Sequence, residues 1–116
     1  MYNYVNLDPE NCDFVVIGDT KDIADGERLF VEIDDLSITV FNIAGEFFAI
    51  EDKCSHDNGS LDDGEIAEHI IKCPRHGASF DVRSGKALSL PAVVDIPAYP
   101  VRINGGEIEV GLPQSV

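Results

Sequence analysis

The sequence predicts an all-β fold, a small antiparallel sandwich or barrel. Two observations carry this prediction. Short runs of β-branched and aromatic residues recur along the chain, and Gly, Asn or Asp residues separate them at short spacing. This pattern alone does not decide between a sandwich and a barrel. A length of 116 residues and an apolar content of 44% favour one domain, residues 1–116, with its own core.

The first half of the chain is expected to form four strands. The run Phe-Val-Val-Ile at residues 14–17 predicts a first strand, and a short helical turn is expected between Asp19 and Asp25. The next runs are rich in Val, Ile, Thr and Phe, which favour a pleated surface, and Ala44-Gly45 supplies a turn between two of them. These further strands are expected at residues 28–33, 37–42 and 46–50.

The second half contains shorter runs separated by stronger turn signals. Strands are expected at residues 70–72 and 79–82, and Ser84-Gly85 marks a turn after them. The triplet Asn104-Gly105-Gly106 is a strong hairpin signal. It predicts a closing hairpin between residues 100–103 and 107–110.

Two short motifs dominate the chemistry of the chain. Cys54-Ser55-His56 and Cys73-Pro74-Arg75-His76 together read C-x-H-x16-C-x-x-H. Each motif offers one thiolate and one imidazole. A [2Fe–2S] centre in which two His replace two Cys on one iron, the Rieske centre, requires this set of ligands. The candidate ligands are therefore Cys54, His56, Cys73 and His76.

Mixed ligation changes the charge of such a cluster. Two ferric ions and two sulfides carry two net positive charges, which two thiolates cancel, whereas four thiolates leave two negative charges. A less negative cluster accepts an electron more readily. His-ligated clusters accordingly span about −150 to +300 mV, against about −400 mV for plant-type ferredoxins with four Cys ligands. The motifs therefore predict an electron-transfer centre.

A structural zinc site is the alternative interpretation of the same four residues. Two Cys and two His also form a tetrahedral zinc site, but such sites usually pair Cys with Cys and His with His. Here each pair is mixed, and the first has one spacer residue. The iron–sulfur interpretation is favoured, and a zinc-stabilised binding module stays open as the less favoured alternative.

The residues around the motifs resemble those of soluble Rieske ferredoxins. Residues 73–81, Cys-Pro-Arg-His-Gly-Ala-Ser-Phe-Asp, are similar to the second cluster loop of that family, and residues 88–92, Leu-Ser-Leu-Pro-Ala, to its proline-containing cover loop. The resemblance extends from about Gly26 to Val110. It implies the Rieske fold, an antiparallel β base with a small cluster-binding subdomain at about residues 51–91.

The resemblance also implies a role for each ligand. Cys54 and Cys73 would hold the inner iron, and His56 and His76 the outer, solvent-near iron. High-potential members of the family place a Ser and a Tyr where this chain has Ala78 and Phe80. Neither of these side chains can donate a hydrogen bond to sulfur. A potential near the low end of the Rieske range, about −150 mV, is therefore expected.

Charge and cysteine count limit the partners and the compartment. The net charge of −14 and the pI of about 4.2 make nucleic acid and anionic membrane surfaces poor partners. No apolar run approaches the length of a membrane span, and the N-terminus does not resemble a signal peptide. With two Cys assigned to the cluster, Cys12 has no partner for an intramolecular disulfide. A cytoplasmic protein is expected.

Acidic residues are spread along the chain, and two groups contain most of them. One precedes residue 36, and the other lies between the ligand pairs; the second comprises Asp57, Asp62, Asp63, Glu65 and Glu68. Solubility accounts for most of these charges. The second group is also the better candidate for docking to a basic face of a redox partner, because it lies near the predicted cluster in sequence.

These observations predict a one-electron carrier rather than an enzyme. The chain is too short for the separate mononuclear iron domain of Rieske oxygenases. The resemblance implies transfer from a flavin-dependent ferredoxin reductase to a terminal Rieske oxygenase, such as a ring-hydroxylating dioxygenase. A small electron-transfer subunit of another oxidoreductase, of the nitrite-reductase type, is the alternative within electron transfer.

Overall fold

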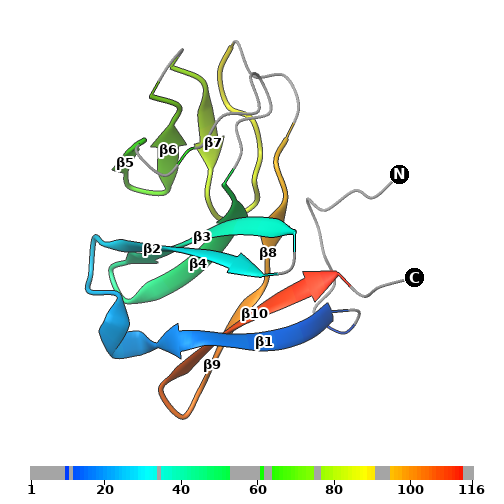
Figure 1. The fold of residues 1–116 in the computed structure, drawn as a ribbon. Coiled ribbons are helices and arrows are strands. Elements are labelled where there is room, and N and C mark those ends of the chain that lie inside the picture. The colour runs from blue at the N-terminus through cyan, green and yellow to red at the C-terminus, as the bar shows by residue number, and fades with distance from the viewer. Residues whose placement is uncertain are drawn as a thin grey trace.

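Three antiparallel sheets form the part of the molecule that this computed structural model describes (Figure 1). The structure describes residues 10, 12–33, 35–52, 61, 64–74, 77–90 and 95–113. Within these residues no α-helix occurs, and the predicted all-β class is confirmed. None of the helical segments in this part of the chain is long and apolar enough to cross a membrane.

Two of the sheets build the base of the molecule. One has the order β1 (Cys12–Asp19), β10 (Glu107–Pro113) and β9 (Val101–Asn104). The other has the order β2 (Arg28–Ile33), β3 (Leu36–Ile43), β4 (Glu46–Glu51) and β8 (Ala98–Tyr99). A 3-10 turn, Thr20–Asp22, follows β1, where the Asp19 side chain accepts a hydrogen bond from the Lys21 amide. This turn confirms the helical turn expected between Asp19 and Asp25.

The third sheet lies beyond the four-stranded sheet, on the side away from β1, β9 and β10 (Figure 1). Its strands are β5 (Glu65–Ala67), β6 (Ile70–Lys72) and β7 (Ser79–Asp81), three residues each. Segment 95–97 then leads back to the base, where β8 pairs with β4. All three short strands lie between β4 and β8 in the chain.

The four-stranded sheet has a core on each face, because successive side chains of a strand point to opposite sides. Ile38 and Val40 of β3 pack with Ile108 and Val110 of β10. Phe41 of the same strand packs on the other side, in the core beneath the short strands. Because both faces are covered, β3 is buried or partly buried along its whole length, including the polar residues Thr39 and Asn42.

Two predicted hairpins have the expected tight turns. Ala44 and Gly45 join β3 to β4 with φ values of 54° and 87°, and Gly105 and Gly106 join β9 to β10 with 60° and 89°. Positive φ at both central residues is the conformation that matches the twist of a two-residue hairpin. Ala44 pays a steric cost there that glycine avoids.

Sequence patterns missed two strands, β5 and β8, of three and two residues. Runs this short carry no periodicity, and β5 consists of Glu-Ile-Ala within an acidic segment.

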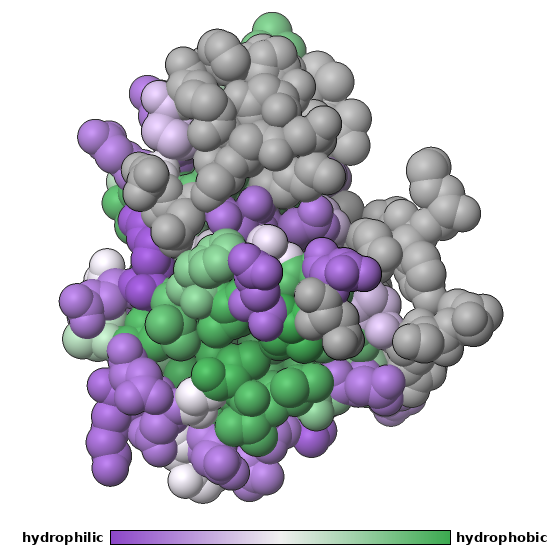
Figure 2. Space-filling model, viewed as in Figure 1, coloured by the Kyte–Doolittle hydropathy of each residue, from purple (hydrophilic) through white to green (hydrophobic). Residues whose placement is uncertain are grey.

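Apolar side chains gather on the face of the base that is turned to the viewer, over β1 and β2 (Figure 2). These two are the edge strands of their sheets, and several of their apolar residues are only partly buried.

Candidate metal centre

The structure describes one of the four predicted ligands. Cys73 directly follows β6, and its side chain is buried at 2% exposure. It belongs to the apolar cluster beneath the short strands, together with Leu61, Ala78 and Phe80. Cys54, His56 and His76 lie outside the described residues. Within the described part of the chain no three His, Cys, Asp or Glu side chains form a group that could hold a metal ion.

Backbone hydrogen bonds close the loop that begins at Cys73. The Cys73 amide donates to the Ala78 carbonyl at 2.7 Å, and the Gly77 amide donates to the Cys73 carbonyl at 3.1 Å. Gly77 has a φ of 77°, which favours glycine. The two ends of residues 73–78 are therefore held together, as a loop that brings two ligands to one metal centre requires.

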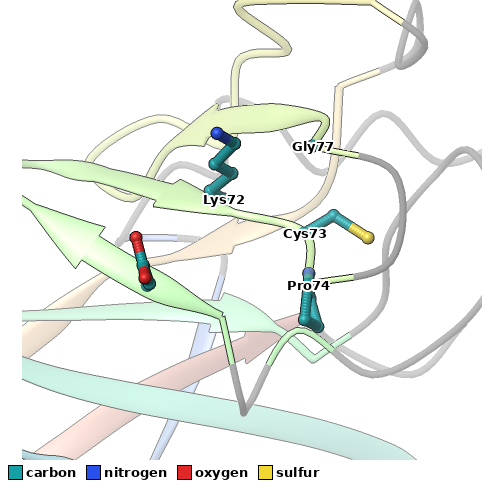
Figure 3. A pocket seen from close by; sticks show the side chains of 5 residues that line it. Lys72, Cys73, Pro74 and Gly77 are labelled. Atoms are coloured by element: carbon teal, nitrogen blue, oxygen red, sulfur yellow. The ribbon is translucent and has the colours of Figure 1, made fainter.

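The side chain of Cys73 points away from that of Lys72, as expected for successive residues at the end of a strand (Figure 3). A pocket of about 350 Å³ lies beside this loop, lined by Glu65, Lys72, Cys73, Pro74 and Gly77. Charged side chains on exposed positions form part of its wall. Among the described residues, the buried Cys73 is the predicted ligand that lines this pocket.

Two further loops at this end of the molecule are closed at their bases by Asp carboxylates. Asp52 Oδ1 accepts a hydrogen bond from the Leu61 amide at 2.8 Å, across residues 53–60. Asp95 Oδ1 accepts one from the Ala87 amide at 2.7 Å, across residues 88–94. The first loop contains Cys54 and His56, and the second contains the predicted cover residues. All three motifs singled out in the sequence thus leave from anchored bases.

Hydrogen-bond donors are lacking at two positions next to Cys73. Ala78 and Phe80 are both completely buried, and neither side chain can donate a hydrogen bond. A buried thiolate beside a closed glycine-containing turn is a suitable ligand for an iron–sulfur cluster, so the described residues fit this cofactor. The apolar side chains at 78 and 80 agree with the expected low potential.

Ionic contacts near the site lie on its outer surface. Arg83 donates from Nε at 3.1 Å and from Nη2 at 2.9 Å to the two Asp81 carboxylate oxygens. The hydrogen bond from Arg83 holds the pKa of Asp81 below its usual value. His69, the one His of the chain outside the two motifs, packs edge-on against Phe48, with ring centroids 5.4 Å apart. It is a packing residue at the edge of the apolar cluster beneath the short strands, which we call the upper core.

Comparison with known families decides the assignment. The profile of the Rieske [2Fe-2S] domain matches residues 13–100. The chain belongs to the Rieske [2Fe-2S] domain family. It therefore carries a Rieske-type [2Fe–2S] cluster, as the ligand motifs predicted, and the zinc-stabilised module is set aside.

Similar proteins include ferredoxin components of dioxygenases. The 3-phenylpropionate/cinnamic acid dioxygenase ferredoxin subunit of Escherichia coli K12 is 42% identical over 95 residues, which cover 81% of this chain and 89% of that protein. The Sphingomonas yanoikuyae B1 ferredoxin is 33% identical, with a TM-score of 0.80, and the match covers 87% of this chain and all of that one. Both likenesses confirm the Rieske fold and the electron-carrier class.

The third similar protein belongs to a solved complex. The match lies in the structure of reduced oxygenase with oxidised ferredoxin of carbazole 1,9a-dioxygenase, at 27% identity and a TM-score of 0.81. It covers 89% of this chain and 96% of the matched one. That ferredoxin is thus found bound to its terminal oxygenase.

Sequence reasoning missed the residues that close the loops. Asp52 and Asp95 did not stand out, because an isolated Asp in a chain with this many acidic residues carries no pattern. Their hydrogen bonds span nine and eight residues and become visible only in three dimensions.

Proposed function

We propose that this chain carries single electrons from a flavin-dependent ferredoxin reductase to a terminal Rieske oxygenase of the ring-hydroxylating type. The observation that carries the proposal is the buried Cys73 at the base of a closed loop, in a chain of the Rieske family. The similarity to dioxygenase ferredoxins over most of this chain supports the partner class. A cytoplasmic location completes the proposal.

Cys54, His56, Cys73 and His76 are proposed to hold the cluster, with the two Cys on the inner iron and the two His on the outer one. The cluster, when bound, supplies reversible one-electron transfer. The chain's own residues set the conditions for that step. Ala78 and Phe80 wall the Cys73 side with apolar surface, which disfavours the more negative reduced state and keeps the potential low.

We also propose a domain organisation in which the base and the cluster-binding part belong to one domain. Residues 1–116 form one Rieske domain, and residues of about 51–91 form its cluster-binding subdomain. The separate apolar core that joins Ile71, Cys73 and Phe80 supports this boundary. Its contact with the base runs through Phe41 and Ile50 of the four-stranded sheet.

Spectroscopy of the purified protein and its ligand variants tests the ligand assignment. The wild-type protein should be red-brown and give the EPR signal of a mixed-ligand [2Fe–2S] cluster after reduction. Cys73→Ser and Cys54→Ser should lose the cluster, and His56→Cys and His76→Cys should change the EPR signal or prevent assembly. Cys12→Ala, which alters the one Cys of the base, is the matched control and should keep the wild-type spectrum. A full-iron His76→Cys protein with unchanged g-values would remove His76 from the ligand set.

Rapid mixing tests the partner assignment. Protein reduced by a flavin-dependent reductase should be reoxidised by a ring-hydroxylating oxygenase within the time of its turnover. Reoxidation by a nitrite-reductase-type partner, with none by any oxygenase, would favour the alternative electron-transfer role.

A further inference from the structure

Asp52 connects the base of the molecule to the first ligand loop. It follows β4, and its amide donates to the Ser37 carbonyl at 2.8 Å, which extends the pairing between β3 and β4. Its side chain is 9% exposed, and its Oδ1 accepts the hydrogen bond from the Leu61 amide. Leu61 is itself completely buried in the upper core.

A carboxylate in this position needs its hydrogen bond. Removing a charged group from water is costly unless partners replace the lost solvation. Hydrogen bonds between a backbone amide and a carboxylate are shorter and stronger than those between neutral groups. The contact therefore fixes the distance between residues 52 and 61, the two ends of the segment that contains Cys54 and His56.

The connection continues from Leu61 to the second ligand loop. The Leu61 carbonyl accepts from the Gly64 amide at 2.8 Å, and the Gly64 carbonyl accepts from Arg28 Nη1 at 2.8 Å. Gly64 packs so tightly that a Cβ there would lie 2.3 Å from the Lys72 carbonyl oxygen. Lys72 directly precedes Cys73. Through these contacts Leu61, which follows the first loop, is linked to Lys72, which precedes the second.

We propose that Asp52 is a positioning residue for the cluster. By holding Leu61, its carboxylate sets the span of the first ligand loop, and hence the placement of Cys54 and His56 relative to Cys73. The inference rests on the proposed ligand assignment. Asp52 acts through the backbone and is not itself a ligand.

Substitutions at Asp52 test the proposal in the intact protein with its cluster. Asp52→Ala removes the acceptor, and Asp52→Asn keeps an oxygen at the same distance. Asp52→Glu keeps the charge but moves the carboxylate by one methylene. Cluster loss in the presence of a ferrous chelator is followed by visible absorbance, and the g-values of the reduced cluster are recorded by EPR. Asp52→Ala should lose its cluster about tenfold faster than wild type, a change of about 1.4 kcal/mol in the barrier, and should show shifted or broadened g-values.

Two variants separate positioning from general destabilisation. Asn42→Ala removes a buried polar side chain whose Nδ2 donates to the Ile23 carbonyl and whose Oδ1 accepts from the Gly45 amide, in the base. It should lower the thermal unfolding temperature while the g-values stay unchanged. Thr39→Val replaces a completely buried hydroxyl that has no hydrogen-bond partner among the described residues. It should leave both the unfolding temperature and the g-values as in wild type.

The possible outcomes decide different questions. A wild-type protein without a [2Fe–2S] spectrum would overturn the proposed ligand assignment. If wild type carries the cluster, the expected order of cluster retention is Asp52→Asn above Asp52→Glu, and Asp52→Glu above Asp52→Ala. If Asp52→Ala fails to fold, the rates of cluster loss from Asp52→Asn and Asp52→Glu still test the positioning role. Unchanged g-values throughout, or faster loss from Asn than from Glu, would overturn the positioning role.

Discussion

The base of the molecule and its upper region are stabilised by different means. In the base, β1 and β3 are each eight residues long. Along nearly their whole length β1 pairs with β10, and β3 pairs with β2 and β4. In the upper region the sheet consists of three strands of three residues each, which is the short end of the usual range of strand lengths. There, loops closed by Asp carboxylates, tight glycine contacts and a shared apolar core replace long ladders.

Glycines show the difference most directly. Gly105 lies in a hairpin turn of the base, and a Cβ built there has no atom within 4 Å. Gly85 lies after β7, and a Cβ there would be 1.8 Å from the Ile96 carbonyl oxygen. The turn needs glycine for its backbone conformation alone, whereas the upper region also needs it for space. The upper region should therefore tolerate substitution less well than the base.

The largest predicted effect comes from placing Ala at these two glycines. Both have positive φ, 77° at Gly85 and 60° at Gly105, so both variants carry the same backbone cost of about 1–2 kcal/mol. Gly85→Ala adds a collision with backbone that can be relieved only by moving segment 95–97, and should cost about 4 kcal/mol or more in total. Urea unfolding of the cluster-loaded proteins, followed by circular dichroism, measures both values.

The difference between the two variants is the critical quantity. If Gly85→Ala and Gly105→Ala are equally stable, the close approach at Gly85 does not constrain the upper region. Loss of the cluster from Gly85→Ala at temperatures where Gly105→Ala retains it would extend the comparison from stability to cofactor binding.

The next prediction concerns the apolar surroundings of the cluster. Ala78→Ser and Phe80→Tyr should each raise the reduction potential above the expected value of about −150 mV, because a hydroxyl that reaches sulfur stabilises the reduced state. One-electron potentials change by about 59 mV for each tenfold change in the equilibrium constant, so increases of tens of millivolts are expected. Protein-film voltammetry measures them. Ala49→Ser, at a buried position of the base core, is the control.

A wild-type midpoint well above zero would contradict both the low-potential argument and the role as electron source for an oxygenase. Equal shifts in Ala49→Ser and Ala78→Ser would show that a buried hydroxyl acts through general packing rather than through the cluster.

How far the sequence predicted the structure also differs between the two regions. The strand at residues 28–33 and the hairpin turns at Ala44-Gly45 and within Asn104-Gly105-Gly106 were predicted correctly, because alternation and turn residues are local signals. In the upper region, β6 was predicted at 70–72, but β5 was missed. β5 is three residues long and pairs with β6, and so short a run has no periodicity that a sequence pattern could reveal.

In the candidate site too, local features were predictable and long-range contacts were not. The ligand motifs are short stretches of sequence, so they sufficed to predict the cofactor that the family assignment confirms. The ligand positions of Cys54, His56 and His76 stay predictions, because these residues lie outside the described part of the chain. The support for the loops, Asp52 beneath one and Asp95 beneath another, could not be predicted, since it depends on which residues the fold brings together.

Surface charge offers a third comparison. Neutralising Asp57, Asp62 and Asp63 as Asn should slow electron transfer to the oxygenase at low ionic strength and weaken its salt dependence, because acidic residues close in sequence to the predicted ligands are the candidates for steering association with the partner. Exposed charges are screened beyond about 10 Å at 0.1 M salt. The matched control removes three exposed charges from the base, Asp13, Glu32 and Glu107. Stopped-flow rates that fall equally in both triple variants would indicate that net charge alone matters.

The smallest predicted effect involves one ion pair in each region. Arg102 hydrogen-bonds Glu109 in the base and lowers the pKa of Glu109, just as Arg83 lowers that of Asp81 above. The two Arg side chains are about equally exposed, at 57% for Arg102 and 55% for Arg83, but Arg102 also lies over the Phe14 ring, 4.0 Å from its centroid. Arg102→Met should therefore lower the unfolding temperature more than Arg83→Met, because it removes this ring contact as well as an ion pair, and exposed pairs contribute little.

The pH dependence of these differences has a definite sign. A carboxyl whose pKa is lower in the folded state stabilises the fold above its unfolded pKa, and this contribution is lost as the pH falls through the folded value. The deficit of Arg83→Met relative to wild type should thus be complete at neutral pH and shrink below the ordinary Asp value of 3.8. That of Arg102→Met should shrink below the ordinary Glu value of 4.5 but keep a remainder, because the Phe14 contact does not titrate. Unfolding temperatures of each variant and wild type, compared at the same pH, measure both deficits, and a deficit that grows on acidification would contradict the assigned ion pairs.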